Sequence, residues 1–248
     1  MHQPTFSESP AAKGIVIFIH GFMGSPRQFN KLAANVYNHG YSVASLLLPG
    51  HGSGIKEFAN ATAESWLNHV YAEVERFAQH YDKIYLVGHS MGSLLAINAA
   101  IRYPQVKGLF LIACPLKVKV ISKQALLVRL KQVFYPKNHP LKAAYLNASS
   151  IPLHPGLLYH SIKPSQQLKK LIAATKDILN NVAIPVTAIY LAADEIVSLD
   201  SLEILQAGLK NTPVKSLILS ESLHAYYPVA EQAIIEEALL AALSSVFD

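Results

Sequence analysis

Short apolar runs alternate along the chain with longer segments in which apolar residues recur every three or four positions. The short runs are rich in β-branched residues and show little polar alternation, which is typical of strands buried on both faces of a parallel sheet. The pattern predicts six such strands, at residues 14–19, 41–48, 83–87, 106–113, 185–192 and 214–219.

The segments between these runs have helical periodicity. The clearest is 62–81, where four apolar side chains share one helical face: Trp66, Val70, Val74 and Phe77. Ser25 followed by Pro26 is a typical helix start, and Gly40 a typical stop. Further helices are predicted at 90–103, 202–209 and 229–247. Strands alternating with helices predict an α/β fold, with a mostly parallel sheet covered by helices on both faces.

The alternation breaks between the strands at 106–113 and 185–192. The intervening residues suggest helical pieces and loops divided by five prolines: Pro136, Pro140, Pro152, Pro155 and Pro164. This stretch is too short and too interrupted for an independent domain. We therefore expect residues 1–115 and 182–248 to form the core, and residues 116–181 to form a small helical cap inserted after the strand at 106–113.

The sequence Gly88-His89-Ser90-Met91-Gly92 matches the G-x-S-x-G pattern of a nucleophile elbow. The pattern alone is weak, since roughly one chain in ten of this length would contain it by chance. Here it lies directly between a predicted strand and a predicted helix, the context that the elbow requires. Ser90 is therefore the predicted nucleophile. His89 should point away from it and have a structural role.

An acid and a base should follow the nucleophile, in the chain order Ser, Asp or Glu, His. Of the five aspartates, Asp194 lies just after the strand at 185–192, at the carboxyl edge of the sheet. Glu195 is the alternative acid. His224 follows the last predicted strand, and we expect it to be the base. Ser90 would then attack an acyl carbon and form an acyl-enzyme that water hydrolyses.

The segment His20-Gly21-Phe22 ends the first predicted strand and can face the elbow. Two preorganised N–H donors stabilise the oxyanion that forms during acyl transfer. The candidates are the backbone N–H groups of Phe22 and Met91. The alternative is that His20 and Gly21 only form the turn.

Together these motifs resemble the α/β-hydrolase superfamily, and most closely its small bacterial carboxylesterases and monoacylglycerol lipases. The resemblance covers roughly residues 13–115 and 183–247. Five features support it: HGF at 20–22, PGHG at 49–52, GHSMG at 88–92, D-x-x-V at 194–197 and a late histidine. It implies hydrolysis of a small-molecule acyl ester by Ser90, Asp194 and His224, with Phe22 and Met91 as oxyanion donors. It also implies a structural role for His51.

The same triad also serves other chemistry on this fold. A thioesterase, an amidase, a C–C bond hydrolase and a cofactor-free haloperoxidase remain alternatives. A non-enzymatic binding protein on this scaffold would lack a triad member, and none is missing from the sequence.

The basic residues are unevenly distributed. The chain has 21 Lys and Arg, and eleven of them lie at 116–176, which contains no Asp or Glu. Such a patch attracts anionic lipid or membrane surfaces or anionic substrates, unless its lysines are simply solvated. The same stretch has an apolar group that could line an acyl pocket or pack the cap onto the core: Leu126, Leu127, Val128, Leu130, Val133 and Phe134.

The composition limits the other possibilities. A hydrophobic fraction of 51% and a charged fraction of 15% indicate an ordered globular protein. The single cysteine, Cys114, excludes an internal disulfide and is expected in the core. Without a secretory signal or a membrane span in the sequence, we expect a cytoplasmic protein. The sequence predicts no metal, no nucleotide cofactor and no nucleic-acid partner, and leaves the oligomeric state open.

Overall fold

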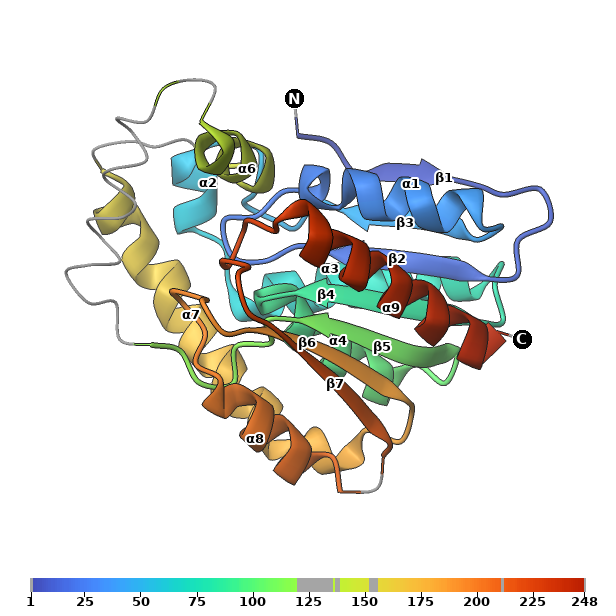
Figure 1. The fold of residues 1–248 in the computed structure, drawn as a ribbon. Helices are drawn as coiled ribbons and strands as arrows, with labels where there is room; N and C mark the ends of the chain where they lie inside the picture. Colours follow the sequence, from blue (N-terminus) through green and yellow to red (C-terminus); the bar gives the residue numbers. More distant parts are fainter. Residues whose placement is uncertain (1, 120–135, 137–138, 152–155, 211, 248) are drawn as a thin grey trace.

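The computed structural model describes residues 2–119, 136, 139–151, 156–210 and 212–247 (Figure 1). Its centre is a seven-stranded sheet in the order β1-β3-β2-β4-β5-β6-β7, parallel except for β1, which pairs antiparallel with β3. The strands are β1 Thr5–Ser7, β2 Ile15–Ile19, β3 Ser42–Leu46, β4 Ile84–His89, β5 Val106–Ile112, β6 Val186–Leu191 and β7 Val214–Leu219.

Helices cover both faces of this sheet. Helices α1 (Asn30–Asn38) and α9 (Val229–Phe247) lie on the near face in Figure 1, and α3 (Ala63–Ala78) and α4 (Met91–Arg102) lie behind it. Helix α8 (Asp200–Gly208) packs against α7 (Leu157–Asp177). The shorter elements are η1 Pro26–Phe29, α2 Ile55–Ala59, α6 Pro140–Ala148 and η2 Leu179–Asn181.

The core confirms the hydrophobic pattern. All six predicted strands are present, and every residue of β2 and β4 is buried. The four apolar residues predicted to share one face of α3 are at most 2% exposed. Burying each such side chain stabilises the fold by about 1.5–3 kcal/mol. Cys114 is also buried, as expected.

Two elements lack a sequence pattern that predicts them. Strand β1 has three exposed residues and forms only through its register with β3, where Phe6 lies opposite Ala44. Helix α2 has five residues and begins after Gly54, whose φ of 129° suits only glycine. Both are too short to show a period of their own.

The segment between β5 and β6 is partly helical. Pro140 begins α6 at its first position, as prolines often do. The expectation that Pro164 would interrupt a helix is wrong, because α7 continues through it for 21 residues. In the second half of α7, Leu171 and Thr175 are buried, and Asn98 Nδ2 donates to Thr175 Oγ1 at 2.9 Å. Part of the predicted cap therefore packs on the core.

Two other sequence predictions are not tested. The domain boundaries at 115/116 and 181/182 remain predictions. The apolar group from Leu126 to Phe134 lies outside the described residues. Within the described residues, every helix is too short or too polar to cross a membrane.

Helix α4 approaches β2 so closely that residue 92 must be glycine. A Cβ at Gly92 would lie 1.9 Å from the carbonyl oxygen of Ile19. Gly40 is a glycine for a different reason, since its φ is 88° but nothing lies within 4 Å of a Cβ there. The first position is limited by space and the second by backbone conformation.

We predict that Gly92→Ala lowers the free energy of unfolding by about 3 kcal/mol or more, because backbone must move to admit the methyl group. Gly40→Ala should lower it by only about 1 kcal/mol, the cost of a left-handed alanine. Urea denaturation of both variants tests this. Equal losses at the two positions would contradict the packing argument.

Candidate active site

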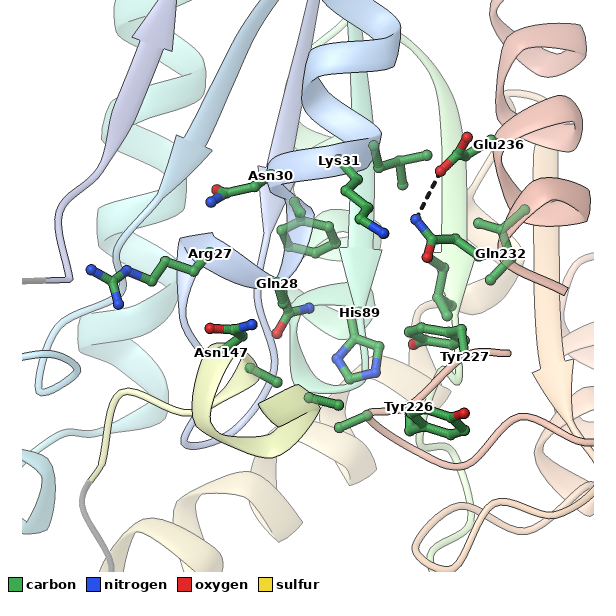
Figure 2. A pocket seen from close by; sticks show the side chains of 17 residues that line it. Arg27, Gln28, Asn30, Lys31, His89, Asn147, Tyr226, Tyr227, Gln232 and Glu236 are labelled. Carbon is green, nitrogen blue, oxygen red and sulfur yellow. Dashed lines mark hydrogen bonds between the residues drawn. The ribbon is translucent and has the colours of Figure 1, made fainter. Parts of the chain in front are cut away.

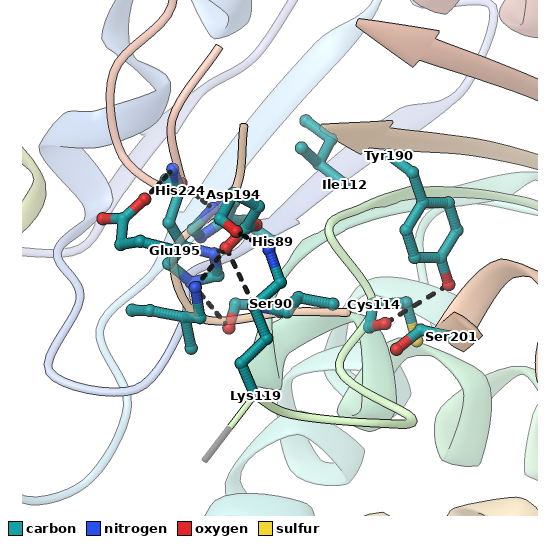
Figure 3. A network of polar contacts seen from close by, with 12 residues as sticks. His89, Ser90, Ile112, Cys114, Lys119, Tyr190, Asp194, Glu195, Ser201 and His224 are labelled. Atoms are coloured by element: carbon teal, nitrogen blue, oxygen red, sulfur yellow. Dashed lines mark hydrogen bonds and ion pairs between the residues drawn. The ribbon is translucent and has the colours of Figure 1, made fainter. Parts of the chain in front are cut away.

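The predicted site residues meet at the carboxyl edge of the sheet, although they are far apart in the sequence. Ser90 follows β4, Asp194 follows β6, and His224 follows β7. Figure 3 shows their side chains converging from these loops. All three are buried.

Ser90 occupies a strained turn between β4 and α4. Its φ of 52° and ψ of −122° are unfavourable for a residue with a side chain, and such strain costs about 1–3 kcal/mol. The Ser90 N–H donates to the Ile112 carbonyl at 2.8 Å, which holds the turn. A Cβ at Gly88 would lie 2.5 Å from the Ser93 Cα, so the turn closes only with glycine there.

A chain of hydrogen bonds joins the three side chains. The Ser90 Oγ lies 3.1 Å from His224 Nε2, and His224 Nδ1 lies 2.8 Å from Asp194 Oδ2. The geometry therefore brings the predicted nucleophile, base and acid together in that order.

The charge of Asp194 sets the tautomer of His224. Burial acts to raise the pKa of the Asp194 carboxyl, but the adjacent His224 and two backbone N–H groups outweigh it and lower the pKa. These donors belong to Ile196 and Val197, at 2.7 and 2.8 Å from Oδ1. An ionised carboxylate accepts only, so His224 donates its Nδ1–H and keeps a lone pair on Nε2, facing Ser90.

The backbone of His224 is held as well. Its N–H donates to Glu195 Oε2 at 3.0 Å, and its carbonyl accepts from His89 Nε2 at 2.9 Å. Glu195, the alternative acid, thus bonds the backbone of the predicted base and not its ring. Burial and the neighbouring His224 lower the pKa of His89 to about 3, so this imidazole is neutral. Its place between two loops fits the structural role predicted for it.

Glu231 also holds the base loop, and no motif pointed to it. It lies in the first turn of α9 and accepts the backbone N–H groups of Ser220, Glu221 and Ser222 at 2.7, 3.0 and 2.7 Å. Burial acts to raise its pKa, but the Ser222 hydroxyl and these N–H groups lower it to about 2. An acidic residue at the start of the last helix was the only hint in the sequence.

The predicted oxyanion donors flank Ser90. A Cβ at Gly21 would lie 3.0 Å from the Ser90 Cβ, so the chain after β2 passes beside the elbow. Among the described residues, the N–H groups of Phe22 and Met91 have no protein acceptor. Met91 is the first residue of α4, where backbone N–H groups have no partner within the helix.

Two neutral histidines hold the backbone beside these donors through hydrogen bonds. His51 donates Nδ1–H to the Pro49 carbonyl and accepts the Met23 N–H at Nε2, both at 3.1 Å. His20 likewise accepts the Leu48 N–H at 3.1 Å. Burial lowers the pKa of His20, and it lowers that of His51 to about 4. The structural role expected for His51 is therefore specific, since it fixes the backbone next to Phe22.

A cavity of about 630 Å³ with both polar and apolar side chains in its wall lies beside this site, between η1, α1, α6 and α9 (Figure 2). His89 and Ala225, the neighbours of Ser90 and His224 in the sequence, lie in its wall. The side chains of Ser90 and His224 do not line it. The cavity is therefore a hollow behind the base loop and not the space above the Ser90 hydroxyl.

Because His51 is buried in its neutral form, the stability of the fold depends on pH. In the unfolded chain His51 takes up a proton below pH 6.5, whereas the folded chain resists protonation down to about pH 4. Stability is therefore lost as pH falls through this window. From pH 7 to pH 4 the native chain should lose about 3 kcal/mol more unfolding free energy than the His51→Gln variant. Urea denaturation across this range measures it, and parallel losses would refute the assignment.

Solved structures of known proteins share this fold. A structure reported for the metagenome-derived lipolytic enzymes LipS and LipT matches with a TM-score of 0.75, 24% identity and 98% of each chain covered. A monoacylglycerol lipase of Paleococcus ferrophilus matches with a TM-score of 0.70, 18% identity, 96% of this chain and 98% of that one. At these identities the matches demonstrate a common fold.

One curated relative is a thermostable monoacylglycerol lipase from Bacillus sp. (strain H-257). It is 28% identical over 107 residues, which span 43% of each chain. The family described as serine aminopeptidase, S33, matches far more of the chain, from residue 10 to residue 227. That range includes Ser90, Asp194 and His224. These findings confirm the predicted resemblance, and the chain belongs to the serine aminopeptidase S33 family of α/β hydrolases, with lipases and esterases among its structural neighbours.

Proposed function

We propose that this protein is a serine hydrolase that cleaves carboxylic esters through an acyl-enzyme on Ser90. The observation that carries the proposal is the buried chain of hydrogen bonds from Ser90 through His224 to Asp194. In this chain the Asp194 carboxyl, whose pKa is lowered, can orient the His224 ring toward Ser90, as nucleophilic catalysis needs.

In the first step His224 Nε2 removes the hydroxyl proton as Ser90 Oγ attacks the acyl carbon. The imidazolium that forms is stabilised by the Asp194 carboxylate, 2.8 Å from Nδ1. The carbonyl oxygen becomes an oxyanion and accepts the N–H groups of Phe22 and Met91. His224 then returns the proton to the departing alcohol.

In the second step a water molecule attacks the acyl-enzyme. His224 removes a proton from that water, and the same two N–H groups stabilise the second oxyanion. The tetrahedral intermediate collapses, the acid is released, and Ser90 regains its proton from His224.

A monoacylglycerol or a similar small acyl ester is the proposed substrate. The names of the Bacillus relative and of the Paleococcus structure support this choice. In this proposal residues 116–181 form the cap over the acyl group. Amide, thioester and C–C bond substrates can use the same triad, and the family description itself names an aminopeptidase. A panel containing an aminoacyl p-nitroanilide, an acyl thioester and a monoacylglycerol separates these activities.

The 116–181 segment exposes apolar side chains on α6 and α7, and we take those on α7 together with Lys163 as its lipid-contacting surface. Leu146 on α6 and Tyr159 and Ile162 on α7 are 60%, 75% and 52% exposed. Lys163 follows Ile162 on α7 and is also exposed, in the stretch without acidic residues. Apolar side chains next to basic ones suit an anionic lipid surface.

Replacing the predicted catalytic residues tests the mechanism. Ser90→Ala should abolish labelling by a fluorophosphonate probe, because the attacking oxygen is gone, whereas Ser93→Ala should still be labelled. Asp194→Asn should lower kcat by roughly 10³–10⁴-fold, because the amide favours the wrong histidine tautomer. Hydrolysis of p-nitrophenyl acetate measures the rate. A labelled Ser90→Ala protein would end the proposal.

Vesicle binding tests the lipid-contacting surface. The protein should bind phosphatidylglycerol vesicles in 50 mM salt and release them in 500 mM salt, because salt screens the lysines. Ile162→Ser should weaken binding at least about threefold by removing apolar contact. Its control is Ile218→Ser, an equally exposed position on β7. Salt-independent binding, or equal effects of the two variants, would contradict the assignment.

A further inference from the structure

The segment between β5 and β6 is bonded to the loop that carries Asp194. Its first residues pair with that loop, where the Lys119 N–H donates to the Ile196 carbonyl at 2.7 Å and the Ser198 N–H donates to the Lys117 carbonyl at 2.9 Å. The Lys119 ammonium also donates to the Asp194 carbonyl (Figure 3). The start of the segment and the acid loop are therefore a connected unit.

The residues that end α6 make a second connection, to the loop beside the oxyanion donors. The Ser150 N–H and the Ser149 hydroxyl both donate to the Met23 carbonyl, at 3.0 and 3.2 Å. From within α6, the Tyr145 hydroxyl donates to Glu195 Oε1. Helix α6 and the two residues after it thus contact two of the loops that build the site.

The carboxylate of Glu195 connects α6 to the base. Its Oε1 accepts the Tyr145 hydroxyl, while its Oε2 accepts the His224 N–H at 3.0 Å. Glu195 is half-buried in a loop, so its side chain would rotate if one of these bonds were lost. The Tyr145 bond therefore holds the carboxylate in the orientation that fixes His224.

We propose that Tyr145 and Glu195 are positioning residues that make the orientation of His224 depend on where α6 lies. Neither side chain touches the reacting atoms, and their effect is transmitted through the His224 backbone to its ring. The kinetic part of this inference rests on the proposed ester hydrolysis. A substrate that displaces α6 would change the geometry of the base that acts on it.

The test combines single and double variants with p-nitrophenyl acetate as substrate. Glu195→Ala should lower kcat roughly tenfold, the effect of losing one hydrogen bond to a charged group, with KM within about twofold. Tyr145→Phe should lower kcat about threefold in the native background. In the Glu195→Ala background it should have no effect, because its target is absent. Glu195→Gln retains an acceptor for the His224 N–H and should restore most of the rate.

A spectroscopic measurement needs no substrate. The His224 Nδ1 proton signal reports the bond to Asp194, and it should exchange faster with water in Glu195→Ala and Tyr145→Phe. Tyr37→Phe on α1 and Glu75→Ala on α3 are controls, since both side chains are exposed, and they should match the native protein. If the native protein cleaves no ester, the proposed function fails, but this signal still tests the coupling.

Three results would overturn the inference. An unchanged kcat and an unchanged proton signal in Glu195→Ala would exclude a positioning role for that residue. Equal effects of Tyr145→Phe in both backgrounds would show that Tyr145 does not act through Glu195. A loss confined to KM or to thermal stability, with no rescue by Glu195→Gln, would leave the pair with a merely structural role.

Discussion

The ionised carboxylate of Asp194 is buried, and the arrangement of the site depends on keeping it charged there. Two backbone N–H groups and the Nδ1–H of His224 compensate for lost hydration. Removing any of these partners would cost much free energy, because an unpaired buried charge is far less favourable than a lost neutral hydrogen bond. The tautomer of His224, and hence the lone pair facing Ser90, follows from it.

Around this interaction, buried and half-buried side chains help to hold the loops at the carboxyl edge. Glu195 and His89 bind the two backbone groups of His224, and Glu231 gathers the three N–H groups that precede it. Backbone strain is also concentrated at this edge, where Met23, Ser90 and Ala113 are non-glycine residues with positive φ. The sheet below supplies the packing that tolerates this strain.

Residues whose role depends on local pattern were predictable. The strands, the elbow and the order of Ser90, Asp194 and His224 follow from apolar runs and from where loops leave a parallel sheet. Residues whose role depends on a distant partner were not. Glu231 bonds the backbone of the loop that precedes its own helix, and Tyr145 contacts Glu195, 50 positions away in the sequence. Strand β1 forms because it pairs with the edge of β3. Pro164 was misjudged because tertiary packing can keep a helix together across a proline.

The sequence by itself determined the α/β alternation, the position of the elbow and the residue types available at the carboxyl edge, since these follow from periodicity and steric demands within short stretches. Only the tertiary structure decided which carboxylate meets the imidazole and which meets the backbone. Asp194 and Glu195 are adjacent, carry the same charge and lie in the same loop. Their roles differ because the fold places the Asp194 carboxylate against the His224 ring and the Glu195 carboxylate against the His224 N–H and the Tyr145 hydroxyl.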